Sequence, residues 1–63
     1  MTKTKLEKLE KKVTPAMEAK HFKLFSKEAR SLGNGVYSVC GQYSTDTREL
    51  FLIYVAIQEN IKF

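Results

Sequence analysis

"ELFLIYVAIQ", residues 49–58, includes eight consecutive apolar residues, and this run decides how a chain of 63 residues can fold. A helix that crosses a bilayer needs about 20 apolar residues, so the run is too short to span a membrane. It must therefore be buried, as a strand or as a helix segment. We predict a strand over 48–58, whose alternate side chains project to opposite sides. Both sides are apolar: one carries Phe51, Ile53, Val55 and Ile57, and the other carries Leu50, Leu52, Tyr54 and Ala56.

The segment before this run also favours strand structure. "VYSVCGQY", residues 36–43, is rich in β-branched and aromatic residues, and "STDT", residues 44–47, has the composition of a four-residue turn. Residues 36–58 are therefore predicted to form an antiparallel β-hairpin.

The pattern before Gly33 is helical. Thr14 and Pro15 are typical of an N-cap and a first helical position, and glycine and asparagine at 33–35 suit a helix end, which predicts a helix over 15–32. Residues 3–12 have only a narrow apolar stripe, so residues 1–13 are either a frayed basic arm or a helix that becomes ordered on docking. The predicted fold class is α+β: one or two N-terminal helices followed by the hairpin, in one domain of residues 1–63.

The usual covalent and metal supports of a small fold are not expected here. Cys40 is the only cysteine and His21 the only histidine, so neither an internal disulfide nor a four-ligand zinc site can form. We expect no metal, no cofactor and no small-molecule substrate. A lone thiol and a polar, lysine-rich start without an export signal favour a cytoplasmic protein.

The predicted hairpin has more apolar surface than one helix can cover. Leaving four large side chains exposed forgoes about 6–12 kcal/mol, which rivals the stability of a whole domain. We therefore predict a homodimer, with an interface formed by Leu50, Leu52, Tyr54 and Ala56. The alternative is that the helix predicted within residues 3–12 covers the second face.

Positive charge is concentrated in the first half of the chain. Residues 1–30 hold nine Lys or Arg against four Asp or Glu, within a net charge of +4. On the predicted helix 15–32, basic residues recur at spacings that place them on one face, opposite the phenylalanines. These residues are Lys20, Lys23, Lys27 and Arg30.

This basic face suggests binding rather than catalysis. His21 and Cys40 suit a base and a nucleophile, but no third member completes a catalytic set, and so small a chain has little room for a pocket that excludes water. We predict a non-catalytic regulatory or inhibitory protein whose basic face binds an acidic surface of a partner protein. The alternative is nucleic-acid binding without sequence specificity, through the same face and the lysines of residues 3–12. Two further interpretations are a solvated face that maintains solubility and a subunit of a larger assembly.

Overall fold

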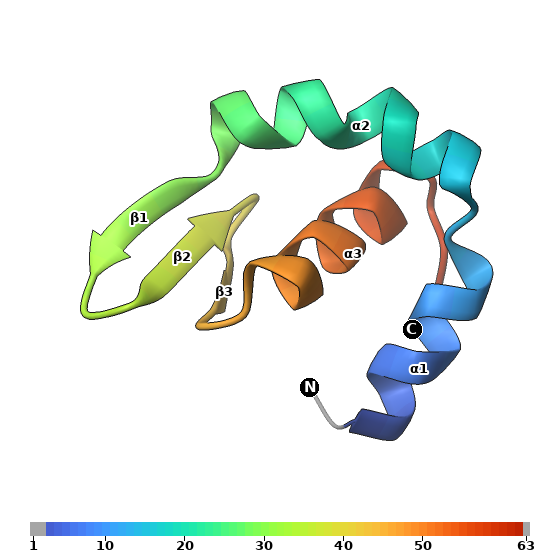
Figure 1. The fold of residues 1–63 in the computed structure, drawn as a ribbon, viewed down its shortest axis with the longest axis horizontal. Coiled ribbons are helices and arrows are strands. Elements are labelled where there is room, and N and C mark those ends of the chain that lie inside the picture. The colour runs from blue at the N-terminus through green and yellow to red at the C-terminus, as the bar shows by residue number, and fades with distance from the viewer. Residues whose placement is uncertain (1–2, 63) are drawn as a thin grey trace.

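The computed structural model describes residues 3–62, which form three helices and one three-stranded antiparallel sheet (Figure 1). The prediction of an α+β fold is confirmed. In chain order the elements are α1 (Lys3–Lys12), α2 (Pro15–Glu28), β1 (Arg30–Gly33), β2 (Val36–Val39), β3 (Gln42–Ser44) and α3 (Thr47–Gln58).

Helix α3 is the centre of the fold, and the prediction of a strand over 48–58 is wrong. Helices α1 and α2 and strands β2 and β3 all pack against α3 (Figure 1). Every side chain from Leu50 to Ala56 is buried. A helix that is apolar on every side is stable when other elements surround it, so the unbroken apolar run needs no strand to explain it.

Local interactions define both ends of α3. The side chain of Asp46 accepts hydrogen bonds from the backbone N–H groups of Arg48, at 2.9 Å, and Glu49, at 3.5 Å. "STDT" is thus the start of a helix rather than a hairpin turn. At the other end Asn60 has a positive φ of 55°, and the N–H of Ile61 donates to the carbonyl of Ala56 at 2.8 Å, which satisfies a helix-end carbonyl.

Helix α2 begins as predicted but ends earlier. The hydroxyl of Thr14 accepts a hydrogen bond from the N–H of Met17 at 3.2 Å, and Pro15 is the first helical residue. The helix ends at Glu28 rather than at residue 32, because Ala29 is already extended and the next residues pair with β2. Arg30 therefore lies on β1 and not on the helix.

The sheet turns at two glycine-containing pairs. Asn34 and Gly35 both have positive φ, 53° and 75°, and connect β1 to β2, while Cys40 and Gly41 connect β2 to β3 with φ of 49° and 78°. Two-residue turns of this conformation match the twist of antiparallel strands. Gly33–Gly35, predicted as a helix end, thus belongs to a hairpin, and "VYSVCGQY" forms two strands instead of one.

Helix α1 is formed and docked. Its Leu9 is fully buried, and Val13, just after the helix, is almost so. Of the two interpretations of this segment, the structure has the docked helix rather than the frayed arm.

No helix among residues 3–62 is both long enough and apolar enough to cross a membrane.

The residues predicted as a dimer interface lie inside the single chain. Leu50, Leu52 and Ala56 have no exposed surface, and Tyr54 is 1% exposed. The homodimer was derived from a two-faced strand that the structure does not contain, so its physical basis is removed.

Candidate functional site

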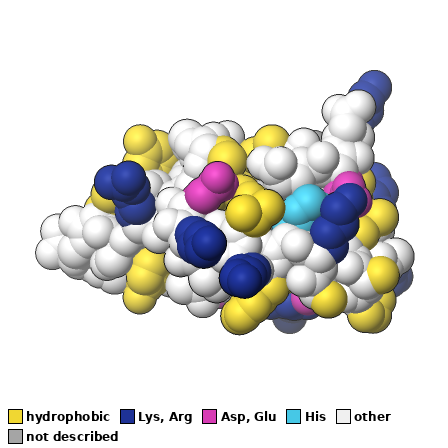
Figure 2. Space-filling model, turned by 90° about the horizontal axis from the view of Figure 1, so that it is seen from above, with side chains coloured by type: hydrophobic (Ala, Val, Ile, Leu, Met, Phe, Trp, Pro, Cys, Tyr) yellow, Lys and Arg dark blue, Asp and Glu magenta, His cyan; other side chains and the backbone are white. Residues whose placement is uncertain are grey.

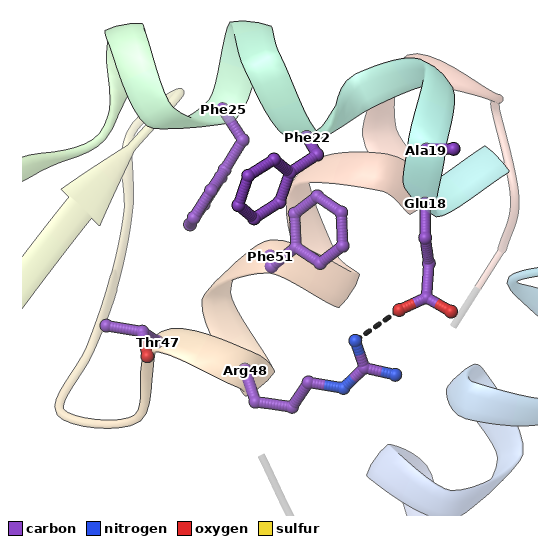
Figure 3. A pocket seen from close by; sticks show the side chains of 7 residues that line it. All are labelled: Glu18, Ala19, Phe22, Phe25, Thr47, Arg48 and Phe51. Carbon is purple, nitrogen blue, oxygen red and sulfur yellow. Dashed lines mark hydrogen bonds and ion pairs between the residues drawn. The ribbon is translucent and has the colours of Figure 1, made fainter. Parts of the chain in front are cut away.

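A groove lies between α2 and α3. It has a volume of about 470 Å³ and we call it the phenylalanine groove (Figure 3). Phe22 and Phe25 from α2 and Phe51 from α3 form its apolar part. The remaining lining residues are Glu18, Ala19, Thr47 and Arg48.

Edge-to-face ring contacts set the shape of the groove. Phe51 lies against both α2 rings, with centroid distances of 6.1 Å to Phe22 and 5.0 Å to Phe25. Phe25 in turn contacts the buried ring of Tyr54 at 5.6 Å. Phe51 is only 7% exposed, whereas Phe22 remains 62% exposed. A rigid buried ring therefore supports a ring that is open to solvent.

Arg48 closes the polar end of the groove (Figure 3). Its guanidinium donates a hydrogen bond to the carboxylate of Glu18 on α2, and its Nε lies 3.7 Å from Glu10 Oε1 on α1. The hydrogen bond to Glu18 and the two negative charges raise the pKa of Arg48, although partial burial opposes the rise. The Arg48 charge is thus already compensated inside the protein.

The predicted basic residues are only partly brought together. Lys20, Lys23 and Lys27 lie on α2, but Lys20 is 3.8 Å from Glu59 and Arg30 is on β1. Viewed from above α2, the Lys and Arg side chains are separate spots with hydrophobic and acidic side chains between them (Figure 2). Lys23 and Lys27 are exposed, and within residues 3–62 neither has an ion-pair partner.

A second, smaller groove of about 290 Å³ is lined almost wholly by lysines. We call it the lysine groove. Lys5, Lys8 and Lys12 recur on one side of α1, and Lys62 comes from the tail that follows α3, around Leu9. Lys12 Nζ donates to the backbone carbonyl of Lys62 at 3.0 Å, which ties the tail to α1.

His21 is a buried polar residue beside α3. It is 7% exposed, its ring meets that of Tyr54 at 6.2 Å, and its Nε2 lies 3.7 Å from Glu59 Oε2. Neither ring nitrogen has a hydrogen-bond partner among the described residues.

Burial raises the pKa of Tyr54, and the hydrogen bond that its hydroxyl donates to Glu28 raises it further.

Cys40 is exposed in the β2–β3 turn, and not within a strand as the prediction for residues 36–43 implies. Its sulfur lies 4.0 Å from Gln58 Nε2. No group of three His, Cys, Asp or Glu within residues 3–62 is arranged to hold a metal ion.

The comparisons with known proteins give no relative: no family model matches the chain, and no curated protein or solved structure is significantly similar to it.

The sequence alone did not predict the phenylalanine groove. Phe22 and Phe25 were predicted on the helix over 15–32 and Phe51 on a strand, which separated the three rings. The missed signal is the spacing Asp46-x-x-Glu49 ahead of an apolar run, which is typical of a helix start. A helix beginning there places Arg48 and Phe51 three residues apart, on the same face.

Proposed function

We propose that this protein is a non-catalytic regulatory or inhibitory protein that binds an acidic surface of a partner protein with the outer side of α2. One observation carries the proposal: Lys23 and Lys27 are exposed and form no ion pair with any residue of 3–62, on the helix that also borders the phenylalanine groove. Complementary charge of this kind speeds encounter and selects acidic partners. Lys20 contributes less, because Glu59 already lies near it.

A second candidate function is binding of nucleic acid without sequence specificity. The observation that favours it is the lysine groove, which is lined by four lysines and by no acidic residue. Lysines in such an arrangement neutralise phosphates and release counterions, so affinity falls steeply with salt. In this alternative α1 is the principal contact and α2 is secondary.

Two matched charge reversals separate these functions. One variant carries Lys23→Glu with Lys27→Glu, and the other carries Lys8→Glu with Lys12→Glu. Fluorescence anisotropy measures the affinity of each for labelled polyglutamate and for labelled duplex DNA, from about 50 to 200 mM salt. We expect polyglutamate binding to weaken about tenfold or more in the α2 variant and little in the α1 variant.

The opposite result supports the alternative. DNA binding that is lost in the α1 variant, together with no measurable binding of polyglutamate, overturns the proposed function. The homodimer and the cytoplasmic location stay predictions from the sequence. Sedimentation equilibrium tests the former, and the proposed function does not depend on it.

A further inference from the structure

We propose that the phenylalanine groove receives a large apolar side chain from the acidic partner, presented by a short amphipathic helix. This inference rests on the proposed function and names what the partner must carry besides negative charge. The first observation is that one wall of the phenylalanine groove is the exposed ring of Phe22.

The groove is suited to an apolar occupant. Its volume of about 470 Å³ lies in the range of pockets that bind small molecules or anchor side chains, and three phenylalanine rings line it (Figure 3). An occupant seated beside Phe22 would remove from water a ring that is now 62% exposed. Burial of such rings in pockets is how a few anchor residues dominate binding energy.

The polar lining residues do not favour a polar occupant. Arg48 and Glu18 are hydrogen-bonded to each other at one end of the groove. A charged ligand would have to compete with this hydrogen bond, and Arg48 also lies near Glu10. The pair therefore limits the groove at one end, and the apolar walls select the ligand.

Charge decides between the available partners. Lys23 follows Phe22 in α2 and projects about 100° further round the helix, next to the exposed wall of the groove, whereas Lys27 projects about 140° from Phe22. A second copy of the chain also carries a net charge of +4, so its approach to the lysines of α2 is electrostatically unfavourable. An acidic helix places carboxylates there instead. Helix-in-groove recognition combines an apolar anchor with flanking charges in this way.

The test uses three labelled peptides of about 15 residues, long enough to begin to form isolated helices. The first is glutamate-rich with a central phenylalanine, the second has alanine in place of that phenylalanine, and the third keeps the phenylalanine but has lysine for each glutamate. Anisotropy gives affinities, and ¹⁵N-HSQC spectra locate the binding on the protein. We expect the first peptide to bind about tenfold or more tightly than the second, and to shift the resonances of Phe22 and Phe51.

Protein variants provide the matched control. Ala19→Leu fills the groove from α2 with a good helix former, and Phe22→Ala removes its exposed wall. Both are expected to reduce binding of the first peptide to that of the second. Tyr43→Ala removes a ring of similar exposure, 66%, from β3 outside the groove, and should leave binding unchanged.

Each contrary outcome has a distinct meaning. Equal binding of the first two peptides, lost in the Lys23→Glu, Lys27→Glu variant, overturns the anchor and leaves the proposed function standing. Equal binding of the first and third peptides overturns the acidic partner and the proposed function with it. No binding of the first peptide up to millimolar concentration, or a dimer that Ala19→Leu dissociates, overturns the inference.

Discussion

Arg48, in the first turn of α3, donates a hydrogen bond to Glu18 on α2 and approaches Glu10 on α1, so that one guanidinium connects all three helices. These groups are partly exposed, and single exposed ion pairs contribute little to stability. A shared guanidinium is more effective because one ordered side chain serves two partners.

A double-mutant cycle measures this connection. Arg48→Met and Glu18→Gln should show a coupling free energy of about 0.5–1 kcal/mol in urea unfolding at low salt, and less at about 1 M salt. Arg30→Met, which removes an exposed arginine from β1, serves as the control and should not couple to Glu18→Gln. Coupling that is independent of salt would show that the electrostatic account of this pair is mistaken.

The cap of α3 is tested at Asp46. Asp46→Ala should lower the free energy of unfolding by about 1 kcal/mol, because two backbone N–H groups lose their acceptor. Asp46→Asn retains a side-chain oxygen and should cost less. Thr45→Ala changes an exposed neighbour and should be close to neutral. If Thr45→Ala cost as much as Asp46→Ala, the N-cap would not be the cause.

The raised pKa of Tyr54 predicts that the free energy of unfolding changes at alkaline pH. Because burial and Glu28 raise its pKa above the ordinary value of 10.0, the folded protein favours the protonated phenol more than the unfolded chain does. This contribution is complete below pH 10 and is lost as the pH rises through the pKa of the folded state. Urea unfolding from pH 8 to 11.5 should therefore show stability falling above about pH 10.

Tyr54→Phe is the control for this pH dependence. The variant should have a free energy of unfolding about 1 kcal/mol lower at pH 8, because it lacks the hydrogen bond to Glu28. Its free energy of unfolding should also fall less steeply at higher pH. An unchanged alkaline slope in Tyr54→Phe would assign the loss of stability to other groups.

The two turns of the sheet predict a reciprocal pair of substitutions. Cys40 and Asn34 occupy the same left-handed position, at φ of 49° and 53°, and asparagine tolerates that conformation better than cysteine. Cys40→Asn should raise the free energy of unfolding by about 0.5–1 kcal/mol and thereby raise the midpoint of thermal unfolding. Asn34→Cys should lower both by similar amounts. Effects of the same sign in both variants would contradict this explanation.

The sequence was informative where structure is decided locally. Thr14 and Pro15 marked the start of α2 because a cap and a proline act within one turn. The strand predicted over 48–58 failed because the apolar run has neither a helical nor an alternating period, and only its neighbours decide its structure. Asn34 and Gly35 were assigned to a helix end, although asparagine–glycine is also the strongest hairpin signal.

The candidate site depended on tertiary packing and could not be predicted from a single element. Phe22 and Phe25 have the same helical spacing as core residues, and only the position of α3 leaves Phe22 open while covering Phe25. The pairing of Lys20 with Glu59 likewise depends on where α3 ends. Exposure and charge compensation, which determine the site, are properties of the assembled elements.

The position of α3 in the chain also affects how this protein folds during synthesis. Residues 47–58 follow every element that packs against them, so α1, α2 and the sheet leave the ribosome before their common core exists. The earlier elements can form local turns and helices, but they have little to bury until the apolar run emerges. A ribosome stalled before Leu50 should therefore carry a nascent chain that proteases digest readily, and protection should appear abruptly once α3 is free.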